Sequence, residues 1–177
     1  MVRHMIPTWR RGTAAVLMAV FCGASGAHAE GNEPLLLGEF GDWSAYSYKA
    51  IDTKVCYVSS RPKASEPKTA KRDPIFFLVT HMPGRSVRGE VSTIIGYPFK
   101  KDTTAELKVD EAAFELFTNA DGAWADSTAT EKKIVAAMKG GQALTVTGTS
   151  WRGTQTVDSY SLNGVSAALA KIDDTCK

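Results

Sequence analysis

The sequence has few of the residues that bind metals or carry out nucleophilic catalysis. It contains three histidines and three cysteines in 177 residues, and His81 is the single histidine after residue 29. No Cys-x-x-Cys spacing, Gly-x-Ser-x-Gly turn or phosphate-binding glycine loop occurs. We therefore expect no metal, no cofactor and no catalytic residue. His81, beside a Met-Pro-Gly turn, is interpreted as an exposed turn residue, and the pair Asp173-Asp174 as solvated helix-end carboxylates.

Long hydrophobic runs are also lacking, and the longest one lies near the N-terminus. Arg3, Arg10 and Arg11 precede an apolar stretch of about a dozen residues, too short for a transmembrane helix of about 20. Ala27-His28-Ala29 then matches an A-x-A cleavage site. Residues 1–29 are thus predicted to be a cleaved signal peptide; an uncleaved anchor helix is the alternative. Lipidation at Cys22 is disfavoured by the bulky Phe21 before it.

Neither sign of charge is in large excess. The predicted signal peptide holds three of the 21 basic residues and none of the 19 acidic ones, so its removal changes the net charge from +2 to about −1. This balance gives no electrostatic reason to expect nucleic-acid binding. The basic segment 61–72 is rich in Pro, Ser and Ala, and a solvated loop is favoured over a site for an anionic partner.

Cys56 and Cys176 are the two cysteines that remain after cleavage. An even pair in an oxidising compartment is typical of a disulfide, here closing a loop of about 120 residues. The chain-entropy model credits such a loop with roughly 4–5 kcal/mol. Two buried free thiols and a metal site are the alternatives, and the shortage of histidine disfavours the metal.

Residues 30–177 are predicted to form one mainly β domain. Strands are expected around 43–48, 54–60, 75–79, 91–97, 105–109, 112–118, 143–150 and 154–162, separated by turn residues. The apolar run 75–79 predicts a central strand covered on both faces, and Trp43 and Trp124 are interpreted as core residues of the sandwich. Two segments switch to helical spacing: 128–138, with a capping box beginning at Thr128, and 165–172. Successive strands without intervening helices favour an antiparallel β-sandwich; a partly open barrel is the alternative.

Several short motifs are distributed through the chain after residue 40. They are Gly41-Asp42-Trp43, Lys54-Val55-Cys56-Tyr57, Arg72-Asp73-Pro74, Ile95-Gly96-Tyr97-Pro98, Phe114-Glu-Leu-Phe117, Gly148-Thr-Ser-x-Arg-Gly-Thr154, Tyr160-Ser-Leu-Asn-Gly164 and Cys176. In this order and spacing they resemble the motifs of the invasion-associated locus B family of exported alphaproteobacterial envelope proteins. The resemblance implies an immunoglobulin-like sandwich, no established enzymatic activity and a link to host-cell invasion. Many relatives carry a cysteine shortly after Gly-Asp-Trp; this chain has Tyr46, Ser47 and Tyr48 there.

The best candidate for a recognition surface is the turn that contains Trp151 and Arg152. An aromatic residue beside an arginine at an exposed tip is the kind of pair that anchors interfaces. The leading hypothesis is a non-enzymatic periplasmic or surface protein that binds a protein or an envelope component, with outer-membrane attachment or release as further locations. The alternatives are a periplasmic hydrolase with an unfamiliar site and a stress-related stability factor or inhibitor. The partner and the oligomeric state are not indicated by the sequence.

Overall fold

The strands follow from alternating apolar residues, and together they account for about half of the described residues. A computed structural model describes residues 33–177, so the predicted signal peptide and Cys22 lie outside the described residues. The strands within this range are β1 (Leu35–Phe40), β2 (Trp43–Lys49), β3 (Lys54–Ser60), β4 (Ala64–Glu66), β5 (Phe76–Met82), β6 (Val87–Ile94), β7 (Thr104–Val109), β8 (Ala112–Asn119), β9 (Gly122–Trp124), β10 (Ala143–Thr149) and β11 (Gln155–Ser161). The helices are α1 (Thr128–Gly140), α2 (Val165–Thr175) and the short 3₁₀ helix η1 (Pro83–Arg85).

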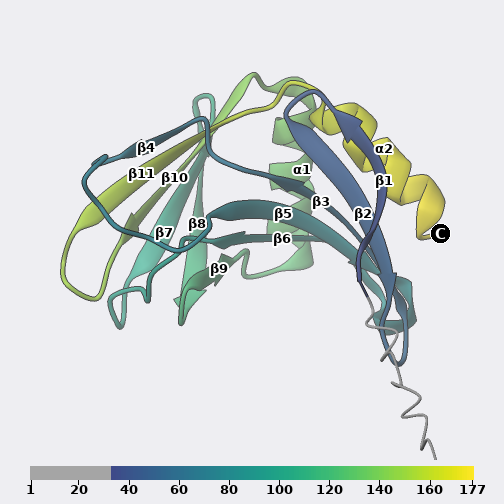
Figure 1. Ribbon diagram of the computed structural model, residues 1–177, viewed down its shortest axis with the longest axis horizontal. Helices are drawn as coiled ribbons and strands as arrows, with labels where there is room; N and C mark the ends of the chain where they lie inside the picture. The colour runs from purple at the N-terminus through teal and green to yellow at the C-terminus, as the bar shows by residue number, and fades with distance from the viewer. Residues whose placement is uncertain (1–32) are drawn as a thin grey trace, which may run out of the picture. The chain divides into compact units, whose positions relative to one another are not determined.

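All the described strands belong to one antiparallel sheet. Its order is β1-β2-β3-β5-β6-β9-β8-β7-β10-β11-β4, so most neighbours in space are also close in sequence. The short strand β9 pairs with β6 on one side and with β8 on the other. It therefore joins a first group of strands (β1, β2, β3, β5 and β6) to a second group (β8, β7, β10, β11 and β4). Figure 1 shows the strong bend that this joined sheet takes.

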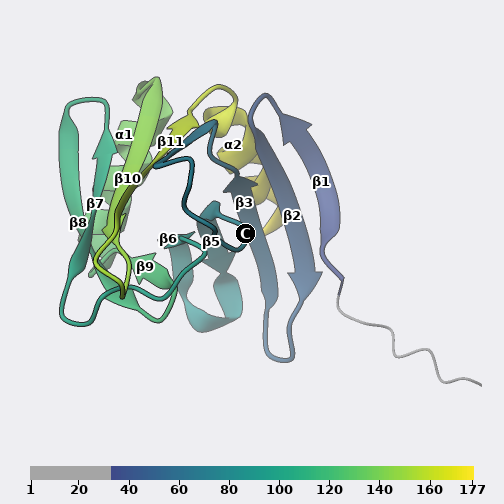
Figure 2. The ribbon, with the colours of Figure 1, turned by 60° about the vertical axis from the view of Figure 1, so that its left-hand side comes forward.

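The bend brings the inner faces of the two groups together. The indole N–H of Trp43 in β2 donates to the carbonyl oxygen of Ser161 in β11 over 2.9 Å. The rings of Phe77 in β5 and Tyr160 in β11 meet edge to face with centroids 5.8 Å apart. Figure 2 shows the two groups on either side, with both helices behind them. The predicted antiparallel β fold with two helices is confirmed, and its two sandwich-like layers are parts of a single sheet.

Both helices lie close to their predicted positions. Ile134 and Met138 of α1 and Leu169 and Ile172 of α2 are buried in the core, at the spacing expected of an apolar helix face. Helix α1 packs mainly on β6, and α2 on β1, β2 and β3 (Figure 1). The cap of α1 is Ser127, whose hydroxyl accepts from the backbone N–H of Thr130 over 3.2 Å. The predicted capping box therefore begins one residue too late.

Two expectations about burial are wrong. Strand β5 is central, but its side chains alternate between buried and half-buried, because Phe76 and Leu78 face the outer side of the sheet. Trp43 is fully buried as predicted, whereas Trp124 is only partly buried and stacks on the exposed ring of Phe117. A run of apolar residues thus marked a strand correctly without showing that both of its faces are covered.

Candidate functional sites: the disulfide corner and the β10–β11 turn

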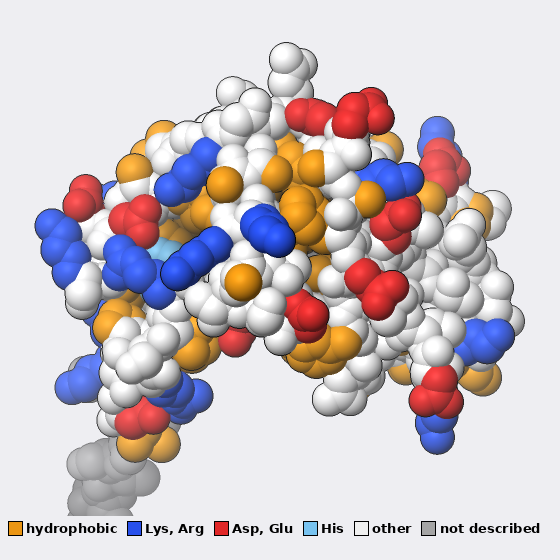
Figure 3. All heavy atoms as spheres, turned by 180° about the vertical axis from the view of Figure 1, so that it is seen from behind, with side chains coloured by type: hydrophobic (Ala, Val, Ile, Leu, Met, Phe, Trp, Pro, Cys, Tyr) orange, Lys and Arg blue, Asp and Glu red, His pale blue; other side chains and the backbone are white. Residues whose placement is uncertain are grey.

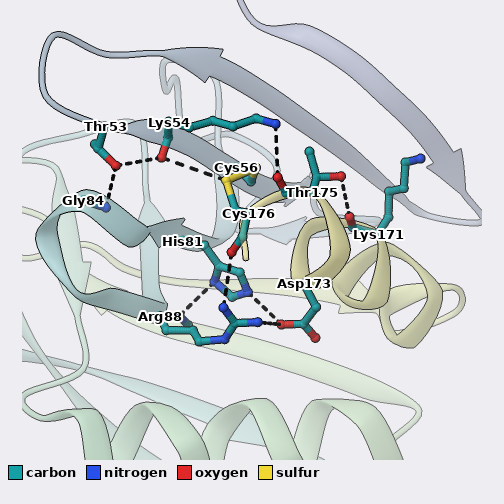
Figure 4. The surroundings of a disulfide bond; sticks show 11 residues. Thr53, Lys54, Cys56, His81, Gly84, Arg88, Lys171, Asp173, Thr175 and Cys176 are labelled. Carbon is teal, nitrogen blue, oxygen red and sulfur yellow. Dashed lines mark hydrogen bonds and ion pairs between the residues drawn. A yellow bond between two sulfur atoms is a disulfide. The ribbon is translucent and has the colours of Figure 1, made fainter.

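Cys56 and Cys176 form the expected disulfide. Cys56 lies in β3 and Cys176 directly follows α2, with their Cα atoms 6.0 Å apart and both residues buried. The bond attaches the C-terminal helix to the first group of strands. Figure 4 shows that polar side chains from β5, β6 and α2 surround it.

His81 lies next to this disulfide and is not an exposed turn residue. Strand β5 runs on to Met82, so His81 pairs with Cys56 of β3 and only 4% of the residue is exposed. Its Nδ1 accepts from the backbone N–H of Gly89 over 3.0 Å, and its Nε2 lies 3.0 Å from Oδ1 of Asp173. An acceptor at Nδ1 requires the proton on Nε2, which then donates to Asp173. The ring is thereby held as one neutral tautomer.

Asp173 contacts two cationic side chains, Arg88 and Lys139, and is therefore not a simple solvated carboxylate. Its Oδ1 accepts from Arg88 over 3.0 Å, and its Oδ2 lies 3.9 Å from Nζ of Lys139. Arg88 also donates to the carbonyl oxygen of Cys176 over 3.2 Å. The contacts of Arg88 connect β6 to the end of α2 (Figure 4), and Lys139 adds a contact from α1. They orient the last turn of α2 in addition to the disulfide.

The predicted recognition turn lies between β10 and β11. Trp151 is 59% exposed, and the guanidinium of Arg152 covers its ring at 4.7 Å, a cation–π distance. The turn is anchored by backbone bonds: Gly153 N–H to Ser150 O (2.7 Å) and Trp151 N–H to Pro98 O (2.9 Å). Gly153 has φ +86°, which explains glycine at this position. The turn therefore presents an aromatic–cation pair on a well-fixed backbone.

A buried ion pair between Arg72 and Asp158 was not expected from the sequence. Their side chains are 4% and 0% exposed, and Arg72 Nη1 donates to Oδ2 of Asp158 over 2.8 Å. Ser65 donates to the same carboxylate over 2.7 Å, and Arg72 also reaches the carbonyl oxygen of Ile95. Thus one member of the basic segment 61–72 is a core residue. The available signal was the inward position of Asp158 in the alternating strand β11.

The sequence-predicted residues fall into separate sites. Trp151 and Arg152 share the β10–β11 turn, and Cys56 and Cys176 share the corner beside α2. Among residues 33–177, no group of three or more His, Cys, Asp or Glu side chains is placed to hold a metal ion. None of the helices in this part of the chain has the length and hydropathy needed to cross a membrane.

Comparison with known proteins places this arrangement in a family. The crystal structure of invasion associated protein B from Bartonella henselae has a TM-score of 0.56, covering 80% of this chain and 97% of that chain at 21% sequence identity. At that identity the likeness shows the shared fold. No curated protein matches the chain. The family model described as "Invasion associated locus B (IalB) protein" matches residues 43–173, which include most of the sheet and both helices. The chain therefore belongs to the invasion associated locus B family.

Proposed function

We propose that this chain is an exported, non-enzymatic protein of the periplasm or cell surface that binds a protein or an envelope component through its β10–β11 turn. The observation that carries the proposal is Trp151, which is 59% exposed and stacked by Arg152. Trp and Arg are enriched among the residues that dominate binding energies. Because backbone bonds already hold this turn, a partner has little loop-ordering entropy to overcome.

Export is supported by two independent features. Residues 1–29 have the charge and hydropathy pattern of a signal peptide. The buried bond between Cys56 and Cys176 is of a type that persists in oxidising compartments such as the bacterial periplasm. Membership of an envelope-associated family is consistent with both.

A non-enzymatic role is supported by the state of His81. A general base needs a free lone pair on its imidazole. The Nδ1 lone pair of His81 is occupied by the Gly89 N–H, and its Nε2 faces Asp173. Freeing Nδ1 for a hydrolase would require breaking the hydrogen bond that the Gly89 backbone N–H donates to the His81 side chain. The hydrolase alternative is therefore less well supported than binding.

The name of the relative suggests the setting in which to look for a partner. The Bartonella henselae protein is called invasion associated, and an exposed anchor turn on an exported domain suits contact with a host or envelope protein. We propose that the partner contacts the Trp151 ring face and forms an ion pair or hydrogen bonds with Arg152. Loss of the aromatic ring should then weaken binding more than loss of the charge.

The test is site-specific photocrosslinking in cells. A benzophenone amino acid is introduced at Thr154, an exposed residue of the same turn that leaves Trp151 and Arg152 in place, and at Ile51 as a control, because Ile51 is fully exposed in the β2–β3 turn. We expect a discrete adduct from position 154 and none of the same mass from position 51. The Arg152→Ala substitution should reduce the yield of this adduct several-fold. Equal adducts from both positions, or an adduct unaffected by Arg152→Ala, would disprove binding through this turn.

A further inference from the structure

A second site lies on a different part of the molecule, beside the disulfide corner. A cavity of about 540 Å³ opens between α1, the C-terminal half of α2 and the β5–β6 hairpin. This volume is within the range of about 300–1,000 Å³ that is usual for small-molecule sites. Nothing in the proposed role of the β10–β11 turn requires this cavity, so it calls for a separate explanation.

One wall of the cavity is a single face of α1. Lys132, Val135, Ala136 and Lys139 all line it, at the spacing i, i+3, i+4 and i+7 that aligns side chains along a helix. The order along this stripe is cation, apolar, apolar, cation. Lys139 lies 3.9 Å from Asp173, and Lys132 forms no ion pair with any acidic side chain in residues 33–177. The two lysines are thus placed at the two ends of an apolar patch.

The opposite wall adds a further cation. Arg88 and Asp173 both line the cavity, and Asp173 already accepts hydrogen bonds from Arg88 and from the neutral His81. Three basic side chains therefore face one acidic side chain that is engaged within the protein. Figure 3 shows this concentration of Lys and Arg around the histidine. Positive charge in a partly enclosed site raises the local concentration of anions.

The inner surface of the cavity is apolar and unfilled. Leu169 is 2% exposed and forms part of it together with the half-buried Val135. Gly89 lies in the same lining with φ +82°, and a Cβ there would meet only Val135 Cγ2, at 3.9 Å. The glycine leaves this side of the cavity open. A ligand with an apolar portion could bury it here and release ordered water.

We propose that this cavity binds an anionic amphiphile. Its carboxylate or phosphate headgroup pairs with Lys132, Lys139 and Arg88, and its apolar chain lies against Val135 and Leu169. Both headgroups present oxygen anions to these cations, so free fatty carboxylates and lipid-derived phosphate monoesters share the recognised chemistry. This proposal is independent of the β10–β11 turn and survives if binding through that turn is disproved.

The test is isothermal titration calorimetry on the processed, disulfide-bonded protein with eight-carbon probes kept below their micelle concentrations. Octanoate and octyl phosphate are the anionic probes, and octylammonium and octyl glucoside are the charge controls. The informative variant is Lys132→Gln/Lys139→Gln. Its matched control is Lys133→Gln/Lys171→Gln, which removes the same charge from two exposed lysines, one on α1 and one on α2, that lie outside the cavity lining.

We expect saturable binding of at least one anionic probe, weakened about tenfold or more by Lys132→Gln/Lys139→Gln and less than about twofold by the control. The probe that binds identifies the headgroup. Amide chemical shifts of Gly89 and Ala136 should move on titration. The proposal is overturned by no saturable binding, by octylammonium binding equally well, by equal weakening in both double variants, or by shift changes confined to other parts of the protein.

Discussion

Two buried cross-links hold distant parts of this domain together, and they do so by different physics. Cys56–Cys176 joins β3 to the residue after α2, whereas Arg72–Asp158 joins the segment before β5 to β11. All four side chains are almost completely removed from solvent. One link is covalent, and the other depends on two opposite charges and the hydrogen bonds around them.

The difference lies in what each link costs the folded state. In the chain-entropy account, a disulfide stabilises by restricting the unfolded chain, and its burial carries little desolvation penalty. A buried ion pair loses the hydration of both charges and recovers it only through good geometry and additional hydrogen bonds. Ser65, Thr156 and the Ile95 carbonyl supply those bonds here. Loss of either partner alone should therefore destabilise the folded protein, whereas replacement of both residues together by apolar residues should cost less stability.

Loss of the covalent link should have the largest effect. The double substitution Cys56→Ser/Cys176→Ser should lower the free energy of unfolding by about 4–5 kcal/mol, because the bond closes a loop of 120 residues. Urea denaturation of the processed protein measures this loss. Wild-type protein in strong reductant is the control and should match the variant. A loss under about 1 kcal/mol would show that the polar contacts around α2 suffice without the bond.

Loss of one charge from the ion pair should have the next largest effect. Asp158→Ala leaves the Arg72 guanidinium buried without its partner and should cost about 3–5 kcal/mol. The double substitution Arg72→Met/Asp158→Leu removes both charges and should cost less than Asp158→Ala alone. The same denaturation experiment compares the two. If the double variant is the less stable one, the pair contributes net stability and the contrast with the disulfide fails.

A much smaller effect is expected for Glu131, a partly exposed carboxylate in the first turn of α1. Partial burial, and then repulsion by Glu90, raise the pKa of Glu131 above its ordinary value. Its ionised form is thus disfavoured in the folded state. Glu131→Gln should stabilise the protein at pH 7 by less than about 0.5 kcal/mol.

The stabilisation by Glu131→Gln should depend on pH, because the pKa of Glu131 is higher in the folded protein than in the unfolded chain. The stabilisation should shrink as the pH falls through the raised folded-state pKa, and it should vanish below the unfolded-state pKa of about 4.3. Thermal unfolding at pH 7 and pH 4 measures it. A gain that is equal at the two pH values would exclude ionisation as the cause.

A small effect is also expected for Tyr160, a buried polar group near Asp158 on the same strand. Its hydroxyl makes no hydrogen bond of normal geometry within residues 33–177, where the Thr93 side chain is only a weak partner, and burial raises the pKa of the phenol. Tyr160→Phe removes an unpaired polar atom and should change stability by less than about 1 kcal/mol, in the stabilising direction. Chemical denaturation checks this. A clear destabilisation would show that the Tyr160 hydroxyl has a hydrogen-bond partner, such as a buried water, just as the Asp158 carboxylate has its own partners.

Local patterns were enough to predict most elements but not their surroundings. The alternation in 105–109 correctly predicted β7, with its Ala105, Leu107 and Val109 buried. The helical spacing of 165–172 predicted α2, and the turn residues predicted the β10–β11 connection. The strands β1, β4 and β9 were not among the expected ones, and β4 and β9 have three residues each, which carry too little periodicity to be recognised.

The candidate sites were predicted less completely than the elements. Pairing of Cys56 with Cys176 could be inferred because residues 30–177 contain no other cysteine. The burial of His81 could not, since it depends on β5 continuing past the apolar run and pairing with β3. Asp173 was interpreted as a solvated helix-end residue because its partners are also distant in the sequence. The two cations that contact it lie on β6 and α1.

By itself, the sequence determined the mainly β class, the two helices, the disulfide and the anchor candidates Trp151 and Arg152. Each depends on residue type and short-range spacing, which are visible without knowing the fold. The tertiary structure alone decided that the layers are one bent sheet, that Arg72 is buried against Asp158, and that Lys132, Lys139 and Arg88 surround one cavity. These features arise from contacts between segments that only folding brings together, and no local periodicity encodes them.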